Sequence, residues 1–455
     1  MNVHFRMLLV IPILCLLVLS GCAPKATPGP TPTAVPTPPT DDLEASARYF
    51  TGLLADGKYA QAYSMFDPQM AAALPVAKLK ATWDEVVRNV GELKGITGVA
   101  LAEKSGYRVA YVACDFARTP LDMQLTFDRE GRIAGMFFLP AGSGGTWKAP
   151  DYADATAFTE TETQIGGGFC TLPATLTMPA GQGPFPAVVL VHGSGPNDRD
   201  ESIGPNKPFN DLAWGLAAQG IAVLRYEKRT KQCAAEVILA MDTLTLNEET
   251  VDDAVAAAAY LRTVDGIAPN RVFILGHSLG GMAAPRIGAQ DSQLAGLILL
   301  AASARPLTVL MLEQTEYLAS LDGKVDDAEA KALAELREQV GKVEALNFAP
   351  GETILGAAKA YWADILAYDP VATARSLNIP MLILQGERDY QVTMEDFAAW
   401  KAGLAGRTDV QFKSYPSLNH LFIAGSGQPN PDEYYVPGNV DQVVVEDIAP
   451  WVKGK

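Results

Sequence analysis

The chain has 455 residues, of which 48% are hydrophobic and 19% are charged, and its formal net charge is −16. The composition is typical of a globular protein with a large core, and the length allows two or three domains. Because an acidic protein repels a polyanion, we expect no nucleic-acid partner.

The N-terminal part of the chain carries signals for export rather than a fold. Arg6 precedes an apolar run from Met7 to Leu19, which is typical of a secretory signal and is too short for a membrane-spanning helix. The stretch LSGC, which ends at Cys22, resembles the bacterial lipobox. The resemblance implies cleavage of residues 1–21 and a lipid on the Cys22 sulfur, whereas an ordinary signal peptide with an incidental cysteine is the alternative. We therefore expect a chain that lies outside the cytoplasm and is anchored to the membrane by lipid.

A spacer and a small domain follow the signal. Residues 22–41 are rich in proline and threonine, and such a segment stays extended as a semi-rigid spacer. In residues 42–138, segments with helical spacing such as DLEASARYFTGLL precede alternating segments such as GYRVAYVACDF. Helices followed by a curled antiparallel sheet resemble the cystatin-like or NTF2-like α+β architecture, often found as a small domain of unknown function ahead of secreted hydrolases. We expect a binding or spacing role for this domain, with contact to the cell wall as one option.

The character of the sequence changes after a linker at residues 139–158. From 159 to 455, short apolar segments such as PAVVLV and VFILG alternate with helical segments. This alternation predicts an α/β fold with a mostly parallel sheet that is covered by helices on both faces. Between about 305 and 377 the alternation stops and helical patterns take over. We predict a helical cap there, inserted between two strands and covering a pocket.

The stretch RVFILGHSLGG predicts a strand, a sharp turn and a helix. This context turns the Gly-x-Ser-x-Gly pattern from a weak signal into a specific one. Gly276 and Gly280 remove side chains that would clash across the turn, so Ser278 projects above the sheet edge at the start of a helix. The helix dipole favours the negative charge that develops there. The pattern predicts Ser278 as a catalytic nucleophile.

A serine hydroxyl is a poor nucleophile without a base, and the sequence contains only four histidines. His4 leaves with the signal. His277 adjoins the serine, and adjacent side chains in such a turn point apart. His192 comes directly after a strand. His420, in the late stretch SLNHLF, remains as the predicted base.

Two carboxylates in the stretch QGERDYQV can orient the base, namely Glu387 and Asp389. The chain order Ser, acid, His and the spacing after the strand favour Asp389, with Glu387 as the alternative. A tetrahedral intermediate also needs two backbone N–H donors, one of them from the residue after the nucleophile. We assign these donors to Leu279 and to Ser194 in the loop HGSG, for which a plain glycine turn is the alternative.

The pieces HGSGPNDRDESIG, AVLRYEKR, GHSLGG, GERDYQV and LNHLF resemble those of bacterial secreted α/β-hydrolases, in particular esterase-D-like carboxylesterases grouped with serine-aminopeptidase-like hydrolases. The resemblance covers about residues 160–455. It implies an α/β-hydrolase fold and hydrolysis of a small-molecule ester through an acyl-enzyme, without a cofactor or metal. A serine peptidase or amidase acting on peptides or cell-wall material is the alternative, because the same triad serves both reactions. One departure is the stretch from Thr230 to Cys233, where a glycine-rich continuation is expected.

Three cysteines remain after the signal: Cys114, Cys170 and Cys233. A Cys170–Cys233 disulfide fits a location outside the cytoplasm. We favour instead three buried, reduced side chains. No spacing of cysteine and histidine indicates a metal site.

Two further groups of residues are assigned structural roles. In the stretch NDRDE, Arg199 is expected to pair with Asp198 or Asp200 and to hold the loop, with substrate contact as the alternative. Three aromatic residues at helical spacing in the predicted cap are expected to pack rather than to line a pocket: Tyr361, Trp362 and Tyr368.

Overall fold

The computed structural model describes residues 42–104, 107–145, 147–167 and 170–454. The predicted signal, the predicted lipidation site at Cys22 and the predicted proline-rich spacer lie outside the described residues. Within the described ranges, no helix is long and apolar enough to cross a membrane. The described chain forms two compact units, divided between Trp147 and Lys148, and a short segment, Tyr434–Pro437, is grouped with the first unit. This division falls within the linker predicted at residues 139–158.

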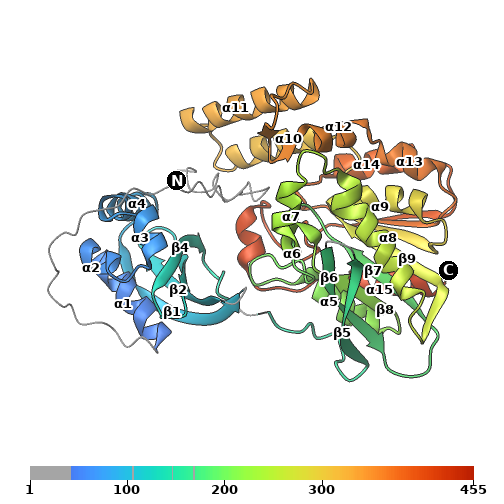
Figure 1. Cartoon of the computed structure of the whole chain (residues 1–455), viewed down its shortest axis with the longest axis horizontal. Helices are drawn as coiled ribbons and strands as arrows, with labels where there is room; N and C mark the ends of the chain where they lie inside the picture. The colour runs from blue at the N-terminus through green and yellow to red at the C-terminus, as the bar shows by residue number, and fades with distance from the viewer. Residues whose placement is uncertain (1–41, 105–106, 146, 168–169, 455) are drawn as a thin grey trace. The chain divides into compact units, whose positions relative to one another are not determined.

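The first unit consists of helices followed by a four-stranded antiparallel sheet (Figure 1). Its elements are α1 (Leu43–Ala55), α2 (Tyr59–Tyr63), α3 (Pro68–Ala73), α4 (Val76–Val90), β1 (Leu93–Lys104), β2 (Tyr107–Phe116), β3 (Leu121–Phe127) and β4 (Ile133–Pro140). The alternation seen in the sequence sets the layers, because Ala110, Val112, Cys114 and Phe116 of β2 are all buried. Trp83 of α4 packs on the Phe116 ring, with the ring centroids 5.8 Å apart. The predicted NTF2-like α+β architecture is confirmed.

The second unit is built around an eight-stranded sheet with the order β14-β13-β10-β9-β7-β8-β6-β5. Its strands are β5 (Phe158–Gly167), β6 (Cys170–Pro179), β7 (Phe185–Val191), β8 (Ala222–Tyr226), β9 (Ile267–His277), β10 (Gly296–Leu300), β13 (Met381–Gly386) and β14 (Val410–Tyr415). The strands from β14 to β8 are parallel, and the hairpin of β6 and β5 at one edge is antiparallel. The predicted α/β fold with a mostly parallel sheet is confirmed.

Helices cover both faces of this sheet, as Figure 1 shows. They are α5 (Pro208–Ala218), α8 (Asp252–Leu261), α9 (Leu279–Gln290), α13 (Pro370–Ser376), α14 (Met394–Gly403) and α15 (Gln442–Lys453). In β7, Val188 and Leu190 lie in one core with α5 and α15, while Val189 and Val191 lie in the other core with α8 and α9. Each fully buried side chain of this size contributes about 1.5–3 kcal/mol. The sheet is therefore a rigid base for the loops at the carboxyl ends of its strands.

The predicted helical insertion lies between β10 and β13. It contains α10 (Leu307–Ala319), α11 (Asp327–Glu344), the short strands β11 (Thr353–Ile354) and β12 (Ala357–Ala358), and α12 (Lys359–Ala367). Figure 1 shows α10 and α11 close together, beyond the core helices α8 and α9. The following helix, α13, packs against α9 and therefore belongs to the core rather than to the cap.

The three cap aromatics pack as expected. The indole N–H of Trp362 donates to a backbone carbonyl of β11 at 2.8 Å. The hydroxyl of Tyr361 donates to the Glu249 carboxylate at 2.5 Å, and the hydroxyl of Tyr368 donates to a backbone carbonyl of α9 at 2.9 Å. Tyr361 and Tyr368 thus tie α12 and the residue after it to the core, while Trp362 bonds to β11 within the cap.

The preference for three reduced cysteines was wrong, because Cys170 and Cys233 form a disulfide. Their Cα atoms are 6.0 Å apart, a separation that suits such a bond. Cys233 lies between the short helices α6 (Arg229–Gln232) and α7 (Ala234–Leu239), so the bond joins the segment after β8 to β6, the strand next to the edge strand β5. Cys114 is free and buried, and burial raises the pKa of its thiol to about 12.

Candidate active site

The predicted nucleophile occupies a strained turn between β9 and α9. Ser278 has φ 53° and ψ −115°, a left-handed conformation that costs a residue other than glycine about 1–3 kcal/mol. A Cβ on Gly276 would lie 2.2 Å from the carbonyl oxygen of Gly280, and a Cβ on Gly280 would lie 2.2 Å from that of Val191. The two glycines thus allow the close approach of strand and helix, as the sequence predicts.

The predicted base and acid are in direct contact. His420 Nδ1 lies 2.6 Å from Asp389 Oδ2, and both side chains are buried. Asp389 follows β13, and its Oδ1 accepts the backbone N–H groups of Gln391 at 2.8 Å and Val392 at 3.0 Å. Because an ionised carboxylate only accepts hydrogen bonds, the imidazole proton lies on Nδ1. Nε2 is then left with a free lone pair, the state that a general base requires.

The loop of His420 meets the serine turn through His277. His277 Nε2 lies 2.9 Å from the backbone oxygen of His420, and the two imidazole centroids are 4.7 Å apart. In the described residues Ser278 Oγ makes no hydrogen bond to His420, and such bonds are often long before substrate binds. Glu387, the alternative acid, is exposed and accepts a hydrogen bond from Ser414 Oγ at 2.8 Å. Asp389, and not Glu387, is therefore the carboxylate that contacts His420.

The glycine-rich loop after β7 adjoins the predicted nucleophile. A Cβ on Gly193 would lie 3.2 Å from the Cβ of Ser278. The Gly193 N–H is already engaged, because it donates to Glu201 Oε1 at 2.5 Å. This leaves the next amide, that of Ser194, as the candidate donor on this loop. Leu279 is the first residue of α9, where a backbone N–H has no acceptor within the helix.

Two buried charged residues beside this loop were missed by sequence reasoning. Lys228 Nζ donates to the Gly193 carbonyl at 2.8 Å and lies 2.7 Å from Glu249 Oε1. Glu201 holds the Gly193 amide, and its second oxygen lies 2.9 Å from His277 Nδ1. Both residues lie in stretches that the sequence singles out, but nothing local marks them as buried.

His192 is a packing residue, in agreement with its elimination as the base. Its ring centroid lies 5.1 Å from that of Phe209 and 5.2 Å from that of Tyr226. Burial lowers the pKa of His192 to about 4. The side chain is therefore neutral near pH 7 and is enclosed on both sides by aromatic rings.

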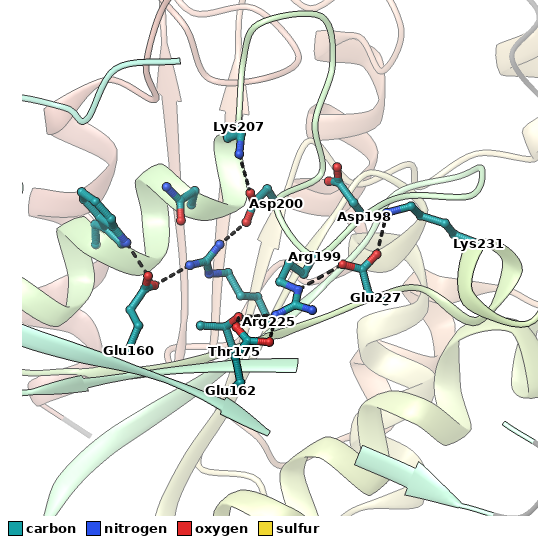
Figure 2. A pocket seen from close by; sticks show the side chains of 12 residues that line it. Glu160, Glu162, Thr175, Asp198, Arg199, Asp200, Lys207, Arg225, Glu227 and Lys231 are labelled. Carbon is teal, nitrogen blue, oxygen red and sulfur yellow. Dashed lines mark hydrogen bonds and ion pairs between the residues drawn. The ribbon is translucent and has the colours of Figure 1, made fainter. Parts of the chain in front are cut away.

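The ion network predicted around Arg199 exists, but the predicted partners were wrong. Arg199 lies 2.6 Å from Glu162 Oε2 and 3.0 Å from Glu227 Oε1, and these residues are drawn in Figure 2. Asp200 instead pairs with Arg225, and its second oxygen with Lys207 at 2.9 Å. Arg199 and Asp200 lie in a turn that is closed by the Glu201 N–H donating to the Asp198 carbonyl, and Arg199 reaches β5, β6 and the segment after β8 rather than the neighbouring aspartates. The network lines a pocket of about 410 Å³ and holds the loop that leads to Glu201.

Within the described ranges, no group of three or more His, Cys, Asp or Glu side chains is arranged to hold a metal ion. What the arrangement offers is a serine, a base–acid pair and two candidate N–H donors. Such a set can carry out acyl transfer with protein groups alone.

Comparisons with known proteins identify the families to which the two units are similar. The profile of the alpha/beta hydrolase family matches residues 188–434, and that of a protein family of unknown function (DUF3887) matches residues 47–136. The chain is 38% identical to Esterase EstD of Thermotoga maritima over 90% of this chain and 95% of that protein. It is 29% identical to a non-heme chloroperoxidase of Burkholderia pyrrocinia over 36% of this chain and 66% of that protein. A solved esterase of Pyrobaculum calidifontis superposes with a TM-score of 0.44 and 18% identity, covering 65% of this chain and 85% of that one.

Proposed function

The chain belongs to the alpha/beta hydrolase family, and we propose that it hydrolyses carboxylic esters with short to medium acyl chains through an acyl-enzyme on Ser278. The observation that carries the proposal is the buried contact between Asp389 and His420, on a loop that meets the serine turn. The similarity to Esterase EstD along most of the chain supports an ester as the bond that is cleaved.

In the proposed reaction, Ser278 Oγ attacks the ester carbonyl carbon while His420 Nε2 takes the hydroxyl proton. Asp389 stabilises the resulting imidazolium, and the N–H groups of Leu279 and Ser194 bind the oxyanion. One such donor is worth about 100- to 1,000-fold in turnover. The intermediate collapses, the alcohol leaves with the proton from the imidazolium, and an acyl-enzyme remains. Water, deprotonated by the same imidazole, then releases the acid and restores the serine.

The first test is hydrolysis of p-nitrophenyl esters from acetate to palmitate by the mature chain and its Ser278→Ala variant. We expect a preference for the shorter acyl chains and a loss of about a million-fold on substitution. Ser376→Ala, which changes an exposed serine on α13, is the matched control and should keep full activity. Near-wild-type hydrolysis by Ser278→Ala would show that this serine is not the nucleophile.

The same residues could cleave amides, so a series of aminoacyl p-nitroanilides belongs beside the ester series. We expect ester hydrolysis to exceed amide hydrolysis by a wide margin. The reverse order of kcat/KM would favour the peptidase or amidase alternative.

We also propose that the mature chain is lipid-anchored at Cys22 and lies outside the cytoplasm. The lipobox-like LSGC supports this location, and a disulfide between Cys170 and Cys233 is typical of an oxidising compartment. The Cys22→Ser variant should lose partition into a detergent phase. Retention of that partition by the variant would contradict the anchor.

For the first unit we propose a binding or spacing role, with contact to the cell wall as the option that the following experiment tests. A chain without residues 42–138 should keep its activity on soluble esters and lose activity on wall-bound substrate. Equal activity of both chains on wall-bound substrate would contradict that role.

A further inference from the structure

Gly193 is held from both sides by buried charges of opposite sign. Its N–H donates to Glu201 Oε1 at 2.5 Å, and its carbonyl accepts from Lys228 Nζ at 2.8 Å. Glu201 and Lys228 are each only 2% exposed. Burying an ion costs several kcal/mol unless its partners compensate. Two buried charges at one glycine therefore indicate that the position of this backbone segment has a function besides packing.

The Lys228 contact, together with a longer one from Asn197 Nδ2 at 3.2 Å, fixes the orientation of the next amide. The Gly193 carbonyl and the Ser194 N–H belong to one planar peptide, and in a trans peptide they point in opposite directions. While Lys228 holds the oxygen, the Ser194 N–H must point away from the ammonium group. A rotation of this peptide would replace the N–H donor with a carbonyl oxygen, which repels an oxyanion. Glycine at 193 makes that rotation sterically easy, so the loop needs an external hold.

The Glu201 contact extends to the loop of the base. Glu201 Oε2 lies 2.9 Å from His277 Nδ1, close enough for an ion pair although not aligned as an ideal hydrogen bond. His277 Nε2 lies 2.9 Å from the backbone oxygen of His420. A carbonyl oxygen only accepts, so His277 carries a proton on Nε2. If Glu201 is ionised, His277 must also be protonated on Nδ1, since two facing lone pairs would repel.

The charges around this pair favour the doubly protonated imidazole. Burial alone would lower the pKa of His277, but the Glu201 carboxylate outweighs burial and raises it, with a smaller contribution from Asp389. Burial alone would raise the pKa of Glu201, but His277 and, to a lesser extent, His192 lower it. The His420 ring is the other titratable group that faces His277.

Glu201 is itself presented by a fixed segment. Its own φ is 51°, a left-handed conformation that costs roughly 1–3 kcal/mol and persists only where the surroundings impose it. The ion pairs of Arg199 and Asp200 in Figure 2 hold the two residues directly before it. The Glu201 N–H donates to the Asp198 carbonyl at 2.9 Å. The network in Figure 2 therefore supports the Glu201 carboxylate, which accepts the N–H of Gly193.

We propose that Lys228 and Glu201 are positioning residues that hold the Ser194 N–H in the orientation that binds the oxyanion. Glu201, through its contact with His277, also holds the loop of Gly193 and Ser194 at a fixed distance from the His420 loop. The inference rests on the proposed function, because it assigns a task within that reaction.

The test compares kcat and KM with the affinity for a trifluoromethyl ketone. The serine oxygen adds to the ketone carbon, the ketone oxygen becomes an oxyanion, and the serine proton passes to the imidazole of His420. We expect Lys228→Met and Glu201→Met to lower kcat by about 100-fold, the cost of a displacement of about 1 Å. The ketone affinity should fall by the same factor, while KM changes little. A role in stability alone would leave the ketone affinity of the folded protein unchanged.

Two further variants separate positioning from charge. Glu201→Gln should keep most of the kcat, since an amide can accept from Gly193 N–H and donate to a neutral His277. Asp291→Leu is the matched control, because it removes a buried carboxylate that pairs with Arg262 at 2.7 Å beyond the far end of α9. Its ketone affinity should equal that of the wild type.

If Lys228→Met fails to fold, the double variant Lys228→Met/Glu249→Gln replaces it, because it leaves no unpaired buried charge. Wild-type ketone affinity in the folded Glu201→Met variant and in the folded Lys228→Met variant, or in the double variant that replaces it, would overturn the inference. Failure of the proposed function gives a different pattern. An unreactive ester series with Ser278-dependent ketone binding would refute ester hydrolysis and leave the positioning test intact. Ketone binding that survives Ser278→Ala would refute the nucleophile and the inference together.

Discussion

Gly280→Ala tests whether the backbone contact behind the nucleophile sets the reaction geometry. The added Cβ would lie 2.2 Å from the carbonyl oxygen of Val191 and 2.6 Å from that of His192. Both neighbours are backbone atoms, so α9 and the end of β7 must separate by roughly 1 Å to reach ordinary contact distances. The end of β7 leads into the loop of Gly193 and Ser194, and α9 begins at the serine turn. The substitution therefore changes the distance between Ser278, the proposed nucleophile, and the proposed oxyanion donors.

We expect Gly280→Ala to lower kcat by about 100-fold, from a displacement of about 1 Å. It should also lower the free energy of unfolding by about 1–3 kcal/mol, as overpacking does. Gly341→Ala in α11 is the control, since its Cβ would meet nothing within 4 Å and its helix should gain about 0.5–1 kcal/mol. The measurements are urea unfolding and p-nitrophenyl acetate hydrolysis. Wild-type kcat and stability in Gly280→Ala would refute the reasoning.

Three other predictions concern groups in or near the site. Asp389→Asn should lower kcat by about 10,000-fold without unfolding the chain, because an amide no longer fixes the imidazole tautomer; a loss below tenfold would contradict this. The Glu201–His277 pair should stabilise the fold most between about pH 4.5 and 6.5. The pKa of His277 is raised in the folded chain, so its contribution to stability is lost as the pH rises through that pKa. The pKa of Glu201 is lowered in the folded chain, so its contribution is lost as the pH falls through that pKa. The difference in unfolding free energy between wild type and Glu201→Gln should thus be larger near pH 6 than near pH 9, and equal differences would argue against the ion pair. Replacement of both Cys170 and Cys233 by serine should cost about 4 kcal/mol in urea unfolding, from a crosslink over a sequence separation of 63, and an unchanged midpoint would show that the crosslink adds no stability.

The sequence contains enough information to predict the fold and the Asp389–His420 contact. Ser278 lies in a local pattern whose meaning depends only on the strand before it and the helix after it. His420 follows from elimination among few histidines, and Asp389 from its place after a late strand. The carboxyl ends of parallel strands meet at one edge of a sheet, so residues after β9, β13 and β14 are brought together by topology alone. Their contacts need no knowledge of side-chain packing.

The supporting residues could not be predicted, because their partners are distant in the chain and their burial has no local mark. Lys228 reaches Gly193 across 35 positions, and Arg199 reaches Glu162 across 37. For Arg199, proximity in sequence suggested the neighbouring aspartates, but the loop directs those side chains elsewhere. A buried lysine and an exposed lysine look alike in sequence. Only the fold shows that Lys228 is enclosed and therefore needs acceptors on every side.

The cap is fastened by ion pairs to the core at both of its ends. At its start, Arg305 pairs with the fully buried Asp396 of α14 at 2.8 Å. Near its end, Arg286 of α9 pairs with Asp364 of α12 at 2.7 Å and lies 4.0 Å from the centroid of the Tyr368 ring. By contrast, the ion pair between α10 and α11 is about half exposed, and such pairs are worth about 0–1 kcal/mol. The helix α11 is held instead by packing, because its Leu333, Val340 and Val343 are buried, and Val343 belongs to the core that also contains α9.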